Sequence, residues 1–313
     1  MDKLSPLASV AQTRMVLEEH GLRTKKALGQ HFLINDGVVS RICALADVGP
    51  ADTVCEIGPG IGTLTLGLLR KGAKVVAIER DADMQAVLAR TTADYTGSFA
   101  LINKDAREVD DEDLKLALAS LNTLPPLPTK LVANLPYAVA ATLVLDFFER
   151  FPALRSATVM VQREVADRMA AQPRTKAYGA YTVKLQLYAK AAGRFMVGPA
   201  NFFPPPRVES VVLRLDRHEL RDNAGALVTP AIREAASLMA DAAFANRRKT
   251  LMNSCKAYLA AGDKPRCPFS ASTLPGLFKD AGISPEVRGE ALSLQDFLSL
   301  GRSLQRLQEP VRP

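Results

Sequence analysis

The sequence lacks several features that would assign it to common protein classes. Its 313 residues include no tryptophan, three histidines and four cysteines. The cysteines are Cys43, Cys55, Cys255 and Cys267. None of them forms a CxxC pair, so we expect neither a zinc site nor a disulfide framework, and no bound metal.

Targeting and membrane signals are missing as well. No apolar run reaches the roughly 18 residues that a membrane-crossing helix needs. The N-terminal region contains Asp2, Glu18 and Glu19 and has no apolar core segment, which argues against a secretory signal and a mitochondrial transit peptide. We therefore expect a cytoplasmic protein with reduced thiols.

The charge is unevenly distributed along the chain. The net charge is +7 and the pI is about 9.3. Residues 51–150 have a net charge of −4, whereas residues 151–220 and 221–313 have +6 and +4. This pattern fits either scattered solvated cations or a polyanionic partner that binds mainly the second half.

Short apolar segments alternate with helical patterns through the first half. Strands are predicted at 52–58, 74–79, 99–105, 130–137 and 157–162, with helices between them. Apolar strands without polar alternation are typical of a parallel sheet covered on both faces, so the fold class is a doubly wound α/β fold. A final strand is expected at 208–215 and a long helix at 231–255. We predict a catalytic domain over 1–221 and a small helical domain over 222–313.

A glycine-rich turn follows the first of these strands. Residues 56–62 read ExGxGxG, and Gly58 and Gly60 let a ligand approach the backbone closely. Glu79 and Asp105 end the next two strands and are suited to bind ribose hydroxyls and an adenine amino group. A NAD fingerprint would have its last glycine at Thr63. The pattern favours S-adenosylmethionine, although a mere tight turn has the same glycines.

The fourth strand ends in the sequence NLPY, where open α/β sheets bind ligands. The Asn134 side-chain oxygen and the Leu135 carbonyl are suited to accept the two N–H groups of an exocyclic amine. Tyr137 offers an aromatic face to a base and to the positive charge that grows on the nitrogen. The alternative is an ordinary proline turn with a tyrosine at the edge of the core.

Three adjacent cations stand within the long predicted helix. Arg247, Arg248 and Lys249 are candidates for RNA phosphate contacts. A solvated helix face is the alternative interpretation.

The combination of these segments resembles the rRNA adenine N6,N6-dimethyltransferase family. The resemblance rests on LGQHFLIN (28–35), EIGPGIGTLT, IERD, NKDA, NLPY, QREVADRM, NFFPPPRVESVVLRL, AFANRRKTLMNS and RGEALSLQDFLSL. It implies a class I S-adenosylmethionine-dependent methyltransferase fold with a small C-terminal helical domain. Cofactor contacts would come from His31, Leu33, Gly58, Glu79, Asp105 and Asn134. Phe202 would stack on the adenine that lies against Asn134, Leu135 and Tyr137. His31 departs from the asparagine that many members have.

Within that family, NLPY, NRRKT and the final RGEALSL resemble the branch that dimethylates two adjacent adenines in the 3′-terminal hairpin of 16S rRNA. That branch also acts in small-subunit biogenesis. The alternative is the macrolide-resistance branch, which modifies an adenine of 23S rRNA. A hypothesis from another class is a ribosome-assembly binding module. In each case the expected partner is RNA or a ribosomal subunit. No feature of the sequence requires this chain to be more than a monomer.

Overall fold

The computed structural model describes residues 3–24, 30–121, 127–261 and 268–308. The beginning of the 28–35 segment, most of the loop that follows residue 121, and Cys267 lie outside these ranges. The described chain divides into two compact units, Met1–Ala166 with Ala191–Arg217, and Asp167–Lys190 with His218–Pro313. No helix among the described residues is both long and apolar enough to cross a membrane.

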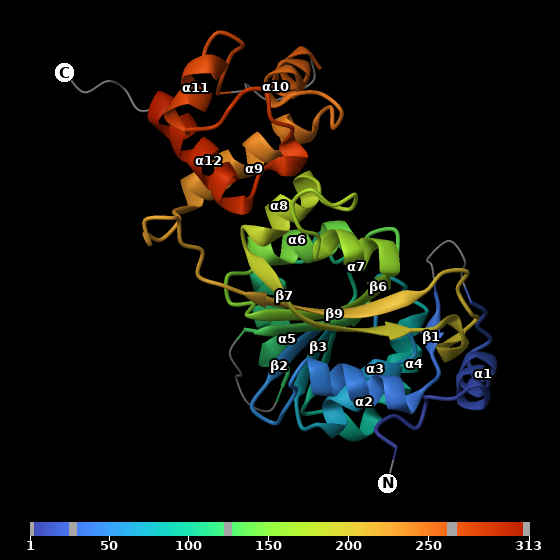
Figure 1. Ribbon diagram of the computed structural model, residues 1–313. Coiled ribbons are helices and arrows are strands. Elements are labelled where there is room, and N and C mark those ends of the chain that lie inside the picture. Colours follow the sequence, from blue (N-terminus) through green and yellow to red (C-terminus); the bar gives the residue numbers. More distant parts are fainter. Residues whose placement is uncertain (1–2, 25–29, 122–126, 262–267, 309–313) are drawn as a thin grey trace. The chain divides into compact units, whose positions relative to one another are not determined.

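The first unit is built on a seven-stranded sheet with the strand order β4-β3-β2-β5-β6-β9-β7 (Figure 1). The strands are β2 (Thr53–Ile57), β3 (Lys74–Ile78), β4 (Phe99–Ile102), β5 (Lys130–Asn134), β6 (Ser156–Gln162), β7 (Ala189–Val197) and β9 (Ser210–Arg217). The first five are parallel, and β9 is antiparallel to β6. All five strands from the alternating pattern are therefore confirmed, and β9 confirms the final strand. Strand β7 was missed.

Helices cover both faces of this sheet. The helices assigned to the first half are α1 (Val10–Glu19), α2 (Asp36–Leu45), α3 (Thr63–Arg70), α4 (Met84–Thr91), α5 (Asp111–Ala119) and α6 (Ala140–Arg150). Helices α2 and α3 lie on one face and α6 on the other (Figure 1). The strands between them are buried on both sides, as Val75 and Val76 illustrate with no exposed surface. The doubly wound fold class is confirmed.

A two-stranded pairing stands apart from the main sheet. Strand β1 (Phe32–Leu33) pairs antiparallel with β8 (Phe202–Phe203), which follows the short helix η3 (Pro199–Asn201). Part of the 28–35 segment is therefore strand. This pairing joins the segment that contains His31 to the loop with three consecutive prolines at 204–206.

The second unit is helical, with α8 (Ala180–Gln186), α9 (Pro230–Phe244), α10 (Leu251–Ala260), α11 (Leu274–Asp280), η4 (Gly289–Ala291) and α12 (Leu294–Gln308). Its core contains Tyr178, Met239, Phe278 and Phe297, each 1% exposed or less. Gly301 allows α12 to pack tightly on α9, since a Cβ there would lie 2.8 Å from the Ile232 carbonyl oxygen.

Two predictions about this region need correction. Residues 167–190 also belong to the helical unit, which is therefore built from two separate stretches of the chain. The boundary predicted near 221 marks the start of the second stretch only. The physical reason is burial, because Tyr178 and Val183 are fully buried in the helical core. The helix predicted at 231–255 is two helices, α9 and α10, separated by a turn. Thr250 begins the second helix, and its side chain accepts a hydrogen bond from the Asn253 N–H.

Candidate active site

A pocket of about 520 Å³ lies at the carboxyl ends of the parallel strands of the first unit. Nine of the ten residues predicted to contact a cofactor or a base line it. These are His31, Leu33, Gly58, Gly60, Glu79, Asp105, Asn134, Leu135 and Tyr137. A pocket of this size suits a small molecule, and its position is the one where open α/β sheets bind ligands.

The glycine-rich turn after β2 forms one wall of the pocket. Gly58 and Gly60 have φ angles of +68° and +57°, in the left-handed region that glycine adopts readily. A Cβ on Gly60 would lie 2.9 Å from Cε1 of Phe32 in β1. Glycine is therefore required at position 60 by both the backbone conformation and the packing.

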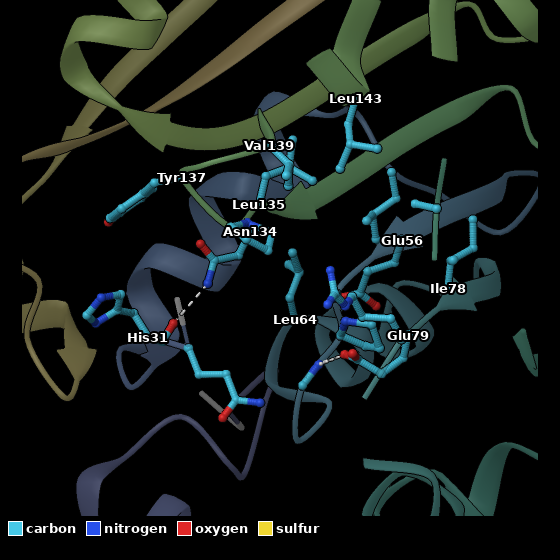
Figure 2. A pocket seen from close by; sticks show the side chains of 18 of the residues that line it. His31, Glu56, Leu64, Ile78, Glu79, Asn134, Leu135, Tyr137, Val139 and Leu143 are labelled. Atoms are coloured by element: carbon cyan, nitrogen blue, oxygen red, sulfur yellow. Dashed lines mark hydrogen bonds between the residues drawn. The ribbon is translucent and has the colours of Figure 1, made fainter. Parts of the chain in front are cut away.

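Glu79 follows β3, and its carboxylate is held by two backbone groups. Oε2 accepts from the Gly60 N–H at 3.3 Å, and Oε1 accepts from the Asp81 N–H at 2.9 Å. Burial raises the pKa of Glu79, an effect that these hydrogen bonds partly oppose. The carboxylate thus has a fixed orientation on the pocket wall and keeps lone pairs for a ligand (Figure 2).

Asp105 follows β4 and is paired with arginine. The Arg107 guanidinium donates to both carboxylate oxygens, at 3.0 and 2.7 Å, and Arg80 lies 3.5 Å away. These contacts lower the pKa of Asp105 to about 2, with the Arg107 hydrogen bonds as the largest cause. Asp105 is therefore an ionised acceptor at neutral pH.

Glu56 lines the same pocket and was not predicted as a site residue, although it opens the ExGxGxG pattern. It is 1% exposed and accepts a hydrogen bond from Thr65 Oγ1 at 2.7 Å. Burial raises the pKa of Glu56 to about 8. At neutral pH the pocket of the free protein thus contains a largely protonated carboxyl group. The signal in the sequence was an acid at the end of a buried strand.

Asn134 ends β5 with its side chain in the pocket. Its Nδ2 donates to the carbonyl oxygen of His31 at 3.1 Å (Figure 2). Among the described residues, Oδ1 accepts no hydrogen bond. This orientation leaves the Asn134 side-chain oxygen available as an acceptor on the pocket wall.

His31 and Tyr137 form an aromatic pair beside Asn134. Their ring centroids are 5.9 Å apart and the rings are nearly parallel, at 25°. Tyr137 Oη lies 2.7 Å from Oγ of Ser210, which begins β9 and is fully buried. His31 Nδ1 lies 2.7 Å from the Pro204 carbonyl oxygen. Ser210 was not identified from the sequence, which gives no signal that it reaches Tyr137.

Phe202 is the residue that the structure does not bring to the pocket. Its side chain is 2% exposed and belongs to the core of the first unit, where it pairs with Leu33 across β1 and β8. The predicted stacking of Phe202 on a base is therefore not supported by its position. Successive side chains of a strand point to opposite faces. Of the two residues of β8, Phe203 is therefore the more exposed and Phe202 the more buried.

The three cations predicted to contact RNA lie in the turn between α9 and α10, not on a helix. Arg248 and Lys249 are exposed. Arg247 is less available for contacts with RNA, because each of its three guanidinium nitrogens donates a hydrogen bond within the protein. The helical placement was thus wrong, and Arg247 differs from its neighbours.

Comparison with solved structures defines the fold class. The chain is similar to a dimethyladenosine transferase from Plasmodium falciparum, with a TM-score of 0.69, 24% identity and coverage of 89% of this chain and 98% of that one. It is also similar to the 23S rRNA methyltransferase ErmE, with a TM-score of 0.59, 23% identity and coverage of 88% and 99%. The fold is that of the S-adenosylmethionine-dependent methyltransferases.

Sequence comparison is more specific. The model of the family "Ribosomal RNA adenine dimethylase" matches residues 21–263. "Ribosomal RNA small subunit methyltransferase A" from Mycobacterium tuberculosis is 38% identical over 93% of this chain and 86% of its own length. The proteins of the same name from Lactococcus lactis and Streptomyces griseus are 34% and 39% identical, covering 98% and 94% of this chain and 99% and 94% of their own lengths. The chain belongs to the ribosomal RNA adenine dimethylase family, as its motifs indicated.

Proposed function

We propose that this protein transfers methyl groups from S-adenosylmethionine to N6 of two adjacent adenines in the 3′-terminal hairpin of 16S rRNA, and thereby acts in small-subunit biogenesis. The relatives named small subunit methyltransferase A support the choice of RNA. The observation that carries the proposal is the Asn134 amide, which is oriented by His31 so that Oδ1 faces the pocket.

The residues of the pocket fit the cofactor. The Glu79 carboxylate would bind the ribose hydroxyls, and the ionised Asp105 would accept from the adenine amino group. Gly58 and Gly60 keep the wall free of side chains, while His31 and Leu33 complete it. When bound, S-adenosylmethionine supplies an electrophilic methyl group on a sulfonium.

The chain's own residues would act mainly by positioning the target amine. Asn134 Oδ1 and the Leu135 carbonyl each accept one N–H, so that the nitrogen lone pair is directed at the methyl carbon. Attack by this lone pair would form the C–N bond at the expense of the C–S bond, with a neutral thioether as the leaving group. The nitrogen loses a proton to solvent, and Tyr137 stabilises its transient positive charge through its aromatic face.

The test is incubation with labelled S-adenosylmethionine and with small and large ribosomal subunits that lack the modifications, followed by mapping of the labelled nucleotides. We expect dimethyladenosine at two adjacent positions of 16S rRNA. Label in 23S rRNA instead would favour the macrolide-resistance type of activity, and absence of label would overturn the proposal.

An Asn134→Ala variant separates catalysis from binding. We expect methylation to fall at least about 100-fold while binding to small subunits is retained, because the change removes one acceptor of the amine. If wild type and variant both bind subunits and neither methylates, the protein is an assembly factor without this chemistry.

A further inference from the structure

The end of strand β6 brings a glutamine side chain to the pocket. Gln162 is the last residue of β6, is half-buried and lines the same pocket as Asn134. In the parallel pairing of β5 with β6, Asn134 lies opposite Met160, two residues before Gln162. Because alternate side chains of a strand point to the same face, Gln162 and Asn134 leave the sheet on one face.

The pairing of β6 with β9 brings Gln162 close to the tyrosine of the NLPY segment. Gln162 lies directly opposite Ser210 in the antiparallel register. Residues opposite each other in such a ladder have Cβ atoms about 5 Å apart on the same face. Ser210 Oγ in turn lies 2.7 Å from Tyr137 Oη. Gln162 therefore belongs to the part of the pocket that the proposed function assigns to the target base.

Gln162 also differs from the other side chains with N–H groups that line the pocket. Its amide makes no hydrogen bond with any other described residue. Each of the others has a partner within the protein: Gln30 has Asp81, His31 has the Pro204 carbonyl, Arg80 and Arg107 have Asp105, Lys104 has Asp113, and Asn134 has the His31 carbonyl. The Gln162 amide thus keeps both of its N–H groups for a ligand.

An amide donor complements a part of adenine that the acceptors of the NLPY segment do not reach. Asn134 Oδ1 and the Leu135 carbonyl suit any exocyclic amine, and cytosine has one as well as adenine. In adenine the amino group stands between two ring nitrogens, N1 and N7, and both accept hydrogen bonds. In cytosine only one ring nitrogen is next to the amino group.

We propose that the Gln162 amide donates a hydrogen bond to a ring nitrogen beside the amino group of the target adenine, and so holds the base through both methyl transfers. This inference rests on the proposed function. The first transfer replaces one N–H by N–CH₃, so the monomethylated amine donates to only one of the Asn134 and Leu135 oxygens. A hydrogen bond to the ring is unaffected by that change, and the second transfer therefore depends on it more.

The test is Gln162→Met, which keeps the length of the side chain and removes the donor. We expect kcat/KM for small subunits to fall about tenfold in the first transfer and further in the second. Monomethyladenosine should therefore accumulate where wild type forms dimethyladenosine. The matched control is Gln85→Met, which removes an exposed amide of α4 outside the pocket and should leave rate and product ratio unchanged.

Two measurements separate base recognition from other roles of Gln162. The melting temperature should be unchanged, because the amide makes no hydrogen bond with the described part of the chain. The affinity for S-adenosylmethionine, measured by titration calorimetry without RNA, should be unchanged as well. A weaker cofactor affinity with the wild-type product ratio would assign Gln162 to the cofactor and overturn the proposal.

Modified bases identify the ring nitrogen. Small subunits are reconstituted with 16S rRNA in which 1-deazaadenosine or 7-deazaadenosine replaces the two target adenosines, so that a C–H stands in place of N1 or N7. We expect one analogue to slow wild type about tenfold and to slow Gln162→Met no further. Wild-type rates on both analogues, or the same additional loss in the variant, would overturn the proposal.

Failure of this inference differs from failure of the proposed function. Dimethyladenosine formed by Gln162→Met at the wild-type rate would overturn the role of Gln162 and retain the methyltransferase activity. Absence of label in any ribosomal RNA treated with the wild-type protein would overturn both.

Discussion

The amide nitrogen of Asn134 donates to the backbone carbonyl of His31, 103 residues earlier in the chain, at 3.1 Å. This one contact decides which atom of the amide faces the pocket. It also makes the NLPY segment dependent on the segment that precedes β1. Sequence reasoning placed both residues at the site but did not connect them.

The first prediction concerns Asn134→Asp. The variant keeps the size and an acceptor oxygen, but it replaces the donor with a second oxygen opposite the His31 carbonyl. Repulsion should rotate or displace the side chain, and we expect kcat to fall about 100-fold. Methylation rates of small subunits at saturating cofactor measure this. Activity close to wild type would mean that the donor to His31 is dispensable.

The second prediction concerns the hydrogen bond between Tyr137 and Ser210, whose oxygens are 2.7 Å apart. Tyr137→Phe and Ser210→Ala each remove it, and each should lower the free energy of unfolding by about 1 kcal/mol. We also expect a several-fold slower methylation, because the ring is held less firmly. The double variant should lose no more than the larger single loss, and urea unfolding of all four proteins checks this. Additive losses would show that the two residues act independently.

The third prediction follows from the buried carboxyl group of Glu56. Burial raises its pKa from 4.5 to about 8, so the folded protein keeps a proton that the unfolded chain releases above pH 4.5. This contribution to stability is therefore fully present below pH 4.5 and is lost as the pH rises toward 8. Glu56→Gln still accepts from Thr65 and should remove that part of the pH dependence. Chemical denaturation between pH 5 and 9 tests it, and parallel pH profiles of both proteins would contradict it.

The fourth prediction isolates the packing of Gly60 against Phe32. Gly60→Ala places a Cβ 2.9 Å from the Phe32 ring at a φ of +57°. We expect the free energy of unfolding to fall by about 2–4 kcal/mol, together with a loss of cofactor affinity. Gly21→Ala is the control, because Gly21 has a similar φ of +64° with nothing within 4 Å of its Cβ. Calorimetric melting of both variants gives the difference, and equal losses would rule out a contribution from Phe32.

Local patterns predicted much of the fold and the pocket. The ExGxGxG turn, Glu79 and Asp105 all lie at or shortly after the carboxyl ends of parallel strands, and the parallel topology brings these ends to one edge of the sheet. Contacts over long sequence separations were not predictable in this way. Positions 247 and 248 are both arginine, so the sequence does not distinguish them. Among the described residues, only the Arg247 guanidinium donates to carbonyl groups 71 and 72 residues away.

The same limit applies to the domain boundary and to the missed strand. Residues 167–190 precede the end of the sheet in sequence, and no composition shift marks them. Their membership in the helical unit depends on Tyr178, whose hydroxyl donates to the Leu292 carbonyl at 2.8 Å, 114 residues later. Strand β7 contains two adjacent alanines and a glycine and is exposed over most of its length, so it gave no buried-strand signal.

The last prediction compares Phe202 with Phe203. The Phe202 ring is buried in the core, so Phe202→Ala should leave a cavity and lower the free energy of unfolding by about 3–5 kcal/mol. Phe203 is partly exposed, with the Arg14 guanidinium 5.1 Å from its ring centroid, and Phe203→Ala should cost about 1–2 kcal/mol. Urea unfolding gives both values, and the KM for RNA is measured under conditions where both variants are folded. A Phe202→Ala protein with wild-type stability but a raised KM would restore the stacking role that the motif implied, since only a ring outside the core can be removed without a packing cost.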